Sequence, residues 1–148
     1  MNNFQPDIIA SRGFKHETHT VTTEDGFIIT VHRIINPYVK KKQNLKPILL
    51  IHPYLVNGAV WVINGDGWLD SDGVYKEYNG DEPILEVNCD PQPNQPNVQT
   101  HGFALSACGY DVWLLSYRGT KYSRKHQYKN QEGNLKANII TDLITINI

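Results

Sequence analysis

The sequence predicts an α/β fold in which an antiparallel hairpin leads into a mostly parallel sheet. Apolar runs at residues 47–55 and 111–115 have the length of buried strands, and a helical pattern at residues 98–108 lies between them. A helix that joins two such strands is a right-handed crossover, so the strands should be parallel, with a ligand face beyond their carboxyl ends. The hairpin is expected from the Thr-, Val- and Ile-rich residues 16–35.

Length and composition fit one globular domain. The 148 residues are 40% hydrophobic and include three Trp, eight Tyr and four Phe, which is enough to build a core. The formal net charge of -1 gives no broad electrostatic attraction to nucleic acid, so we expect no nucleic-acid partner. No apolar run has the length of a transmembrane helix, and residues 1–10 lack the pattern of a signal peptide.

The hairpin is expected to turn at Asp25-Gly26. This pair suits a two-residue type I′ turn, because both central positions of that turn need positive φ. Such a turn would place His19 opposite His32 on one face of the hairpin and His16 on the other. Two histidines make a poor zinc site, so we expect an ordinary cross-strand pair and no metal.

Between the hairpin and the second apolar run, the pattern changes three times. Residues 36–46 form a polar link with three consecutive lysines, typical of a solvated loop. The run from Pro47 to Leu55 is continuous and too short for a helix, which predicts a strand buried on both faces.

Residues 65–97 are rich in Gly, Asp, Asn and Pro and lack any period, which predicts a surface insertion with a flexible acidic loop.

The carboxyl-terminal part begins with the best helical signal. The helix expected within Val98–Cys108 should end at Gly109, which suits the left-handed backbone region, and the strand at 111–115 follows. Residues 129–148 show no caps and no clear period, so their structure is uncertain. Cys89 and Cys108 lie far apart in the sequence and outside any Cys-x-x-Cys pair, which excludes a disulfide scaffold and gives no metal signature.

Three blocks of sequence follow one another in a fixed order: Gly13–Ile34, Lys46–Gly65 and Gly102–His126. Their most specific features are the Thr-x-Asp-Gly-Phe hairpin and the Gly-Tyr-Asp-Val-Trp strand. Together the blocks resemble the amino-terminal part of the acid lipases, the gastric and lysosomal triacylglycerol and steryl-ester lipases. The resemblance implies that residues 7–128 are the amino-terminal part of an α/β-hydrolase fold, incomplete in this chain, with 129–148 as a tail outside the pattern.

The resemblance also implies one element of a catalytic site. In that family, His-Gly and an apolar residue follow the third strand and form one side of the oxyanion hole; here these positions are His52, Pro53 and Tyr54. The backbone N–H of Tyr54 would then stabilise the oxyanion that forms when serine attacks an ester. Pro53 removes the backbone freedom that glycine gives at this bend. Local sequence alone leaves open that His52-Pro53 merely ends a strand.

The second strand leads into a stretch with a partial match. Ser116-Tyr117-Arg118-Gly119 resembles the family's Asn-Ser-Arg-Gly, with Ser and Tyr in place of the first two residues, and Ser-Arg-x-His follows at 123–126. We expect Arg118 to tie neighbouring loops together and Gly119 to give the turn. The basic residues after Gly119 are read as a solvated face.

The reactive half of an ester-hydrolysing site is absent from the sequence. An esterase of this fold needs a Gly-x-Ser-x-Gly elbow followed by an acid and a histidine, and no such elbow occurs. Ser106 lies inside the expected helix, and Ser116 is flanked by Leu114 and Arg118, which would crowd an elbow. We therefore assign no catalytic nucleophile, acid or base to this chain.

The resemblance implies a truncated member of the neutral-lipid ester hydrolases that is inactive alone and needs no cofactor. Its partners would be neutral lipid esters or the lipid–water interface, once other residues complete the site. The resemblance suggests a secreted or lysosomal location, whereas the sequence itself leaves the location unknown. An alternative from another class is a non-catalytic lipid-binding or regulatory module built on a partial lipase fold.

Overall fold

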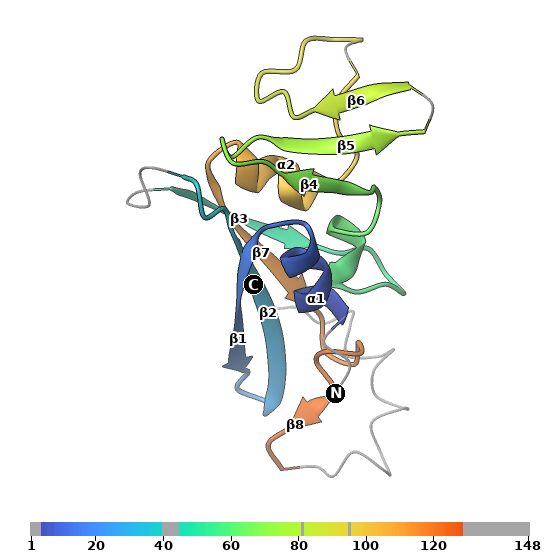
Figure 1. Ribbon diagram of the computed structural model, residues 1–148. Coiled ribbons are helices and arrows are strands. Elements are labelled where there is room, and N and C mark those ends of the chain that lie inside the picture. The colour runs from blue at the N-terminus through green and yellow to red at the C-terminus, as the bar shows by residue number, and fades with distance from the viewer. Residues whose placement is uncertain (1–3, 40–44, 81, 95, 129–148) are drawn as a thin grey trace.

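The computed structural model describes residues 4–39, 45–80, 82–94 and 96–128, whose strands form two sheets (Figure 1). The three lysines at 40–42, which are expected in a solvated loop, and the tail at 129–148 lie outside the described residues. In chain order the elements are α1 Phe4–Ser11, β1 Lys15–Thr22, β2 Phe27–Ile35, β3 Lys46–Ile51, the 3-10 helix η1 Gly58–Trp61, β4 Gly67–Leu69, β5 Tyr75–Asn79, β6 Glu82–Glu86, α2 His101–Ala107, β7 Tyr110–Ser116 and β8 Lys125–His126.

The larger sheet has the strand order β1-β2-β7-β3, with β8 paired to β2. The predicted parallel pair is confirmed, because β3 and β7 run parallel and α2 lies between them in the sequence. The expectation of a mostly parallel sheet is wrong for the described strands: β1, β7 and β8 all pair with β2 in the antiparallel direction. The hairpin is not separate from the sheet, because its second strand, β2, pairs with β7 and β8. The sheet is therefore mixed.

The hairpin turn is one residue longer than the two-residue type I′ turn that Asp25-Gly26 suggests. The Gly26 N–H donates to the Thr23 carbonyl at 2.9 Å, and of the turn residues only Gly26 has positive φ, at 91°. The Thr23 hydroxyl also accepts a hydrogen bond from the Phe27 N–H at 3.0 Å. These contacts close a three-residue loop with a glycine bulge, a common hairpin alternative.

The longer turn shifts the register of the hairpin by one residue. Thr18, and not His19, is opposite His32, and His16 is opposite Ile34. Because side chains alternate between the faces of a strand, His19 and His32 point to opposite faces, and His16 shares the face of His32. The predicted His19–His32 pair is therefore wrong. His32 is buried, whereas His19 is exposed and contacts the Trp113 ring.

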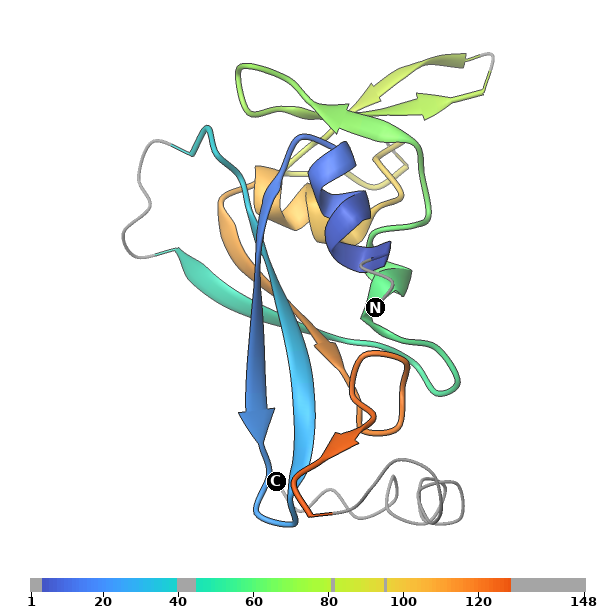
Figure 2. The same ribbon diagram turned by 60° about the horizontal axis from the view of Figure 1, so that its bottom comes forward.

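Strand β3 ends at Ile51 and pairs only with β7 among the described strands. The expectation of burial on both faces is wrong, since Leu49 and Ile51 keep 52% and 47% of their surface exposed. Their partners in register on β7 are Trp113 and Leu115. Both helices lie on the other face of this sheet (Figure 2). In the described part of the chain, β3 is thus an apolar edge strand.

The insertion at 65–97 is more ordered than its composition suggests. Strands β4, β5 and β6 form a second, antiparallel sheet, which lies above α2 in Figure 1. Tyr75 at its centre is fully buried and Leu69 is 7% exposed, so one face of this small sheet belongs to the core. A glycine- and aspartate-rich composition obscured the short strands because their apolar positions are few.

The core lies between the two sheets, where α1 and α2 also pack (Figure 2). Phe14, Tyr75 and Phe103 form an aromatic cluster with ring centroids 4.8 to 5.8 Å apart. Helix α2 begins three residues later than the pattern at 98–108 predicts and stops as expected before Gly109, whose φ is 83°. Helix α1, with Ile9 fully buried, was not predicted, because eight residues give too little apolar periodicity.

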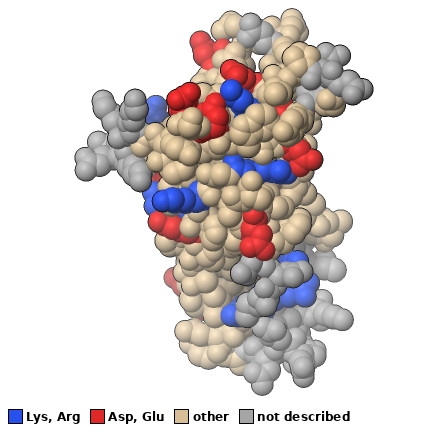
Figure 3. Space-filling view, in the orientation of Figure 1, with Lys and Arg blue, Asp and Glu red and all other residues tan. Residues whose placement is uncertain are grey.

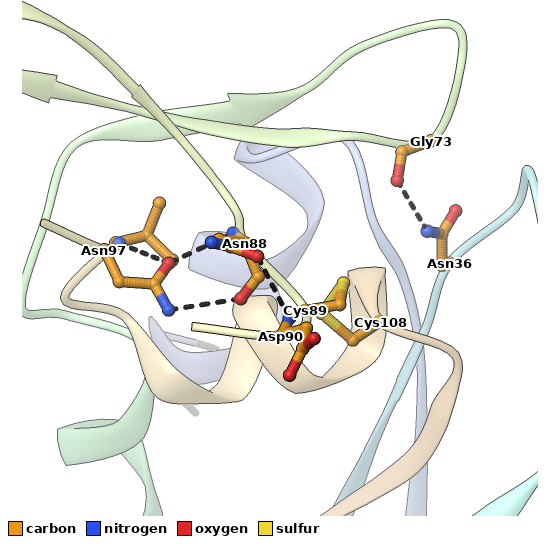
Figure 4. The surroundings of a disulfide bond; sticks show 8 residues. Asn36, Gly73, Asn88, Cys89, Asp90, Asn97 and Cys108 are labelled. Carbon is orange, nitrogen blue, oxygen red and sulfur yellow. Dashed lines mark hydrogen bonds between the residues drawn. A yellow bond between two sulfur atoms is a disulfide. The ribbon is translucent and has the colours of Figure 1, made fainter. Parts of the chain in front are cut away.

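Cys89 and Cys108, whose pairing the sequence left open, form a disulfide (Figure 4). Cys89 follows β6 and Cys108 is the carboxyl-terminal cap of α2, so the bond joins the insertion to the helix. Their separation of 19 residues gave no signal of pairing. The second sheet returns the chain to α2, which brings the two cysteines together.

Candidate functional site

The two loops singled out by the sequence meet at one edge of the larger sheet. In the parallel register, Ile51 is opposite Leu115, so the residues after β3 and after β7 emerge side by side. These are His52, Pro53 and Tyr54 on one loop and Tyr117 to Gly119 on the other. The expected position beyond the carboxyl ends of the parallel strands is therefore confirmed.

His52 joins these loops. Its ring is 4% exposed, its Nε2 accepts a hydrogen bond from the Tyr117 N–H at 3.0 Å, and its Nδ1 lies 2.8 Å from the Pro53 carbonyl oxygen. A nitrogen that accepts carries no proton, so Nδ1 is the protonated nitrogen of a neutral imidazole and donates to Pro53. The Tyr117 ring packs edge-on against His52, with centroids 4.7 Å apart.

The hydrogen bond to Pro53 sets the direction of the next amide. The peptide bond between Pro53 and Tyr54 is trans, so its C=O and N–H point in opposite directions within one plane. Since the carbonyl points at the His52 ring, the Tyr54 N–H points away from it. This N–H has no hydrogen-bond acceptor among the described residues, and Tyr54 itself is 59% exposed.

The bend after Tyr54 uses an unusual backbone conformation. Leu55 has a φ of 69°, in the left-handed region that glycine adopts more easily, and is 86% exposed. Such a conformation costs an L-residue on the order of 1 kcal/mol. Asn57 then stops the bend: its side-chain oxygen accepts a hydrogen bond from the Ala59 N–H at 2.9 Å and caps η1. Proline at position 53 cannot adopt the left-handed conformation, and the loop adopts it two residues later, at Leu55.

The start of η1 fixes this loop against the end of β7. A Cβ added to Gly58 would lie 3.1 Å from the Leu115 carbonyl oxygen and 3.2 Å from the Ser116 hydroxyl oxygen. Any larger residue would crowd these two oxygens, so glycine favours the close approach of η1 to the end of β7. Asn57 and Gly58 together hold the loop after β3 beside the residues that follow β7, Tyr117–Gly119, which we call the β7 loop.

Arg118 ties the β7 loop to the hairpin turn, as the sequence predicts. Its Nη1 lies 2.5 Å from a carboxylate oxygen of Asp25, and its guanidinium lies 4.7 Å from the centre of the Phe27 ring. The Thr23 hydroxyl and the Arg118 guanidinium both hydrogen-bond Asp25 and hold the pKa of that carboxyl below its usual range. The turn predicted at Gly119 is present, with a φ of 81°.

The residues that follow Gly119 also have structural contacts. Strand β8 pairs with the start of β2, and the His126 ring packs edge-on against Phe27 at 4.8 Å. The Ser123 hydroxyl donates to the Ser116 carbonyl at 2.6 Å and accepts from the Thr30 N–H at 2.8 Å. The Ser-Arg-x-His stretch therefore holds the β7 loop to the hairpin. Figure 3 shows acidic and basic side chains interspersed on the face it displays.

Neither serine considered from the sequence is accessible to a substrate. Ser106 is 1% exposed on α2, and Ser116 is fully buried at the end of β7. An ester carbonyl cannot reach either hydroxyl in this conformation. No three His, Cys, Asp or Glu side chains gather into a possible metal site within the described residues.

Apolar side chains surround the exposed Tyr54 amide. Tyr54, Leu55, Val56 and Ile63 are all exposed by 39% or more. No Asp, Glu, Lys or Arg occurs from Pro47 to Asn64. We call residues 53–63 the Tyr54 loop. Its surface is apolar and uncharged, which suits contact with hydrocarbon better than contact with an ionic ligand.

A separate cavity of about 340 Å³ lies at the opposite, amino-terminal end of β7. An ion pair occupies its wall: Arg33 Nε lies 2.7 Å from an Asp111 oxygen, and Arg33 Nη1 lies 3.1 Å from Glu17. These contacts, with Asp111 as the stronger, raise the pKa of Arg33. Two carboxylates share one guanidinium, so these three groups carry one net negative charge at the cavity wall.

Within the described residues, no helix is both long and apolar enough to cross a membrane. Residues 5–65, which include most of α1, the hairpin, β3 and the whole Tyr54 loop, match the family described as the partial alpha/beta-hydrolase lipase region. The match thus covers His52, Pro53 and Tyr54.

Curated proteins similar to this chain are lipases. The chain is 34% identical to Lipase 1 of Drosophila melanogaster over 80% of its length and 19% of that protein's. It is 32% identical to Lipase member M of Homo sapiens over 82% of its length and 22% of the relative's. It is 33% identical to a putative lysosomal acid lipase/cholesteryl ester hydrolase of Crotalus adamanteus, over 81% of its length and 23% of that protein's. The chain spans about a fifth of the length of these relatives.

Proposed function

We propose that this chain, which carries the partial α/β-hydrolase lipase region and whose homologues are lipases, supplies one wall of a site that hydrolyses neutral lipid esters. The wall consists of the Tyr54 loop and the β7 loop. The serine nucleophile, its acid and its base belong to residues outside this chain, since no Gly-x-Ser-x-Gly elbow occurs in the sequence. The chain is then an amino-terminal portion of a lipase and is inactive alone.

The single observation that carries this proposal is the direction of the Tyr54 amide. When serine attacks an ester, the carbonyl oxygen becomes negative, and fixed N–H donors stabilise it. The His52 ring holds the Pro53 carbonyl at 2.8 Å, so the Tyr54 N–H points away from that ring, and it has no acceptor among the described residues. A donor that is already oriented needs no reorganisation when the charge appears.

The surroundings of that amide support an uncharged, hydrophobic substrate. The Tyr54 loop carries four exposed apolar side chains and no formal charge. An acyl chain would gain about 0.8 kcal/mol for each methylene group buried against such a surface. The names of the relatives in the comparison, among them a cholesteryl ester hydrolase, fit a neutral lipid ester.

Removing the amide while keeping the loop would test the proposal. A lipase homologue whose corresponding segment is replaced by residues 5–126 of this chain provides the missing nucleophile. In that chimera we expect Tyr54→Pro, which lacks the N–H, to lower kcat about 10²–10³-fold on a triacylglycerol emulsion. Tyr54→Phe keeps the amide and should retain kcat to within about twofold, so it serves as the matched control.

Two further measurements separate loss of the donor from loss of the fold. Circular dichroism and the exchange protection of the Tyr117 amide should be the same in both variants, because His52 and not Tyr54 holds that amide. If Tyr54→Pro is folded and turns over at the rate of Tyr54→Phe, the amide does not stabilise the oxyanion and the proposal is wrong.

A further inference from the structure

The disulfide between Cys89 and Cys108 closes a segment that little else secures. The two Cα atoms are 5.4 Å apart, and the bond spans 19 residues that include the loop after β6 and the whole of α2. Figure 4 shows the bond near Asn88 and Asn97, the first and last residues of the loop that contains Cys89. We call residues 88–97 the Asn88 loop.

Two hydrogen bonds between the described residues join the ends of the Asn88 loop. The Asn88 N–H donates to the Asn97 side-chain oxygen at 3.2 Å, and the Asn97 side-chain N–H donates to the Asn88 carbonyl at 3.3 Å. Of the loop residues whose exposure is described, all from Cys89 to Pro96 are exposed, so no apolar burial fixes the loop. Burial resumes at Val98, which is 6% exposed.

Helix α2 also needs support from outside. It has seven residues, and its Thr100 cap makes no side-chain hydrogen bond. A helix this short is unstable without tertiary contacts. One end is held by Glu77, whose carboxylate accepts hydrogen bonds from the Gln99 and Thr100 N–H groups. The other end is Cys108, so the disulfide is the covalent tie at the carboxyl end of α2.

We propose that the Cys89–Cys108 disulfide is a structural cross-link that forms in an oxidising compartment and holds the Asn88 loop against α2. Its formation removes two electrons and two protons from the Cys89 and Cys108 thiols, while the disulfide of a thiol oxidant is reduced to two thiols. Such bonds persist in secreted and lumenal proteins and are reduced in the cytosol. The assignment of compartment rests on this bond and is independent of the proposed ester hydrolysis.

Access to the bond favours exchange with a thiol reagent. Cys89 is exposed and Cys108 is half-buried, so a thiolate can attack the Cys89 sulfur without unfolding the core. Reduction should therefore loosen the Asn88 loop and the end of α2 first. The hairpin β1–β2 has no covalent link to this region and should be unaffected.

Peptide mapping tests whether the bond forms. The full chain, secreted from a host cell and alkylated before lysis or denaturation, would be digested without reduction. We expect one linked pair of peptides containing Cys89 and Cys108, with neither cysteine alkylated. Alkylation of both cysteines in the secreted chain, or links between different chains in place of this one, would overturn the proposal.

Hydrogen exchange tests what the bond does. On reduction with dithiothreitol, we expect the amides of the Asn88 loop and of α2 to exchange at least about tenfold faster, and those of β1 and β2 to change less than about twofold. The Cys89→Ala/Cys108→Ala variant should match the reduced chain and not respond to dithiothreitol. Equal exchange in the oxidised and reduced chains would show that the bond holds nothing and would contradict the proposal.

Discussion

At the scale of the residue, His52 shows how one neutral imidazole can orient a backbone donor that it does not touch. Its Nε2 accepts a hydrogen bond from the Tyr117 N–H, and its Nδ1 donates one to the Pro53 carbonyl. Because the Pro53–Tyr54 peptide is trans, the direction of this carbonyl also sets the direction of the Tyr54 N–H. Protonation would replace the acceptor at Nε2 with a donor and break the bond to Tyr117. The geometry of the site therefore requires the neutral ring.

We predict that His52→Ala releases the Tyr117 amide. The variant leaves that N–H without its acceptor, so its exchange rate should rise by about tenfold or more, at a cost in stability of about 1–3 kcal/mol. Nuclear magnetic resonance of the exchanging amides would measure this. His101→Ala on the exposed start of α2 is the control and should leave Tyr117 protected. A Tyr117 amide that stays protected in His52→Ala would mean that another group holds the β7 loop.

His32 makes stability depend on pH. It is 2% exposed, and burial lowers its pKa to about 4, with a smaller effect from His16. The unfolded chain binds this proton below about pH 6.5, and the folded chain binds it only near pH 4. The unfolded state therefore holds more protons between these values, so the free energy of unfolding falls as the pH drops through that window.

We expect the His32 contribution to be about 2 kcal/mol between about pH 7 and about pH 5. Urea denaturation at the two pH values would measure the free energy of unfolding. His32→Gln should lose this part of the pH dependence, whereas the matched variant His19→Gln, on the exposed face of the same hairpin, should keep it. If His32→Gln and the wild-type chain lose equal free energy on acidification, His32 is not the group responsible.

At the scale of the element, Glu77 joins the insertion to the rest of the fold. It lies on β5, is 2% exposed, and accepts hydrogen bonds from the Gln99 and Thr100 N–H groups at 2.6 and 2.9 Å. A carboxylate at the start of a helix is favoured by the amides that have no partner within the helix. One side chain of the small sheet thus caps α2.

We predict that Glu77→Ala lowers the free energy of unfolding by about 1–3 kcal/mol, because the Gln99 N–H and the buried Thr100 N–H lose their acceptor. Glu77→Gln keeps one carbonyl oxygen and should cost less. Glu86→Ala is the control in the same sheet: its carboxylate pairs with Lys76 at 3.0 Å but is 63% exposed, so its loss should cost less than about 1 kcal/mol. Denaturant unfolding of the three variants would decide, and equal losses for Glu77→Ala and Glu86→Ala would contradict the capping role.

Elements were predicted from the sequence where one local signal dominates. The parallel strands around α2 and the stop at Gly109 follow from apolar runs and a glycine. The hairpin turn was mispredicted because Thr23 adds a side-chain hydrogen bond that the Asp-Gly pattern does not contain. The second sheet and the disulfide depend on contacts between distant residues, which no local pattern encodes.

The candidate site shows the same division. The sequence could predict that the residues after β3 and the β7 loop lie side by side, because neighbouring parallel strands have their carboxyl ends at the same edge of a sheet. The hydrogen bond from Tyr117 to His52 and the left-handed Leu55 could not, since both depend on how the loops pack. The left-handed conformation at this bend falls on Leu55, two residues after Pro53, and the sequence pattern did not single Leu55 out.

At the scale of the whole molecule, the larger sheet is covered by helices on one face only among the described residues (Figure 2). Strand β3 is at the edge of this sheet, and its Leu49 and Ile51 are exposed on the face without helices. A free apolar edge strand is a template for pairing with another chain. The opposite edge, β1, is mostly polar and carries lysine, glutamate and histidines.

We therefore predict that the isolated chain self-associates through β3. Sedimentation velocity should show oligomers or aggregates for the wild-type chain, and Leu49→Lys/Ile51→Lys should shift the distribution toward monomer. Val21→Lys on β1 removes an apolar side chain of similar exposure, 56%, and should behave like the wild type. A monodisperse wild-type monomer, or an equal effect of Val21→Lys, would show that β3 is not the contact.

The most direct test of the central claim, that this chain orients an oxyanion donor without possessing the nucleophile, is an esterase assay of the purified 148-residue chain on a short chromogenic ester. We predict no turnover above that of the heat-denatured chain, and no difference on adding a serine-directed phosphonate. Turnover that the phosphonate abolishes would contradict the claim, because it would show a reactive serine within these residues.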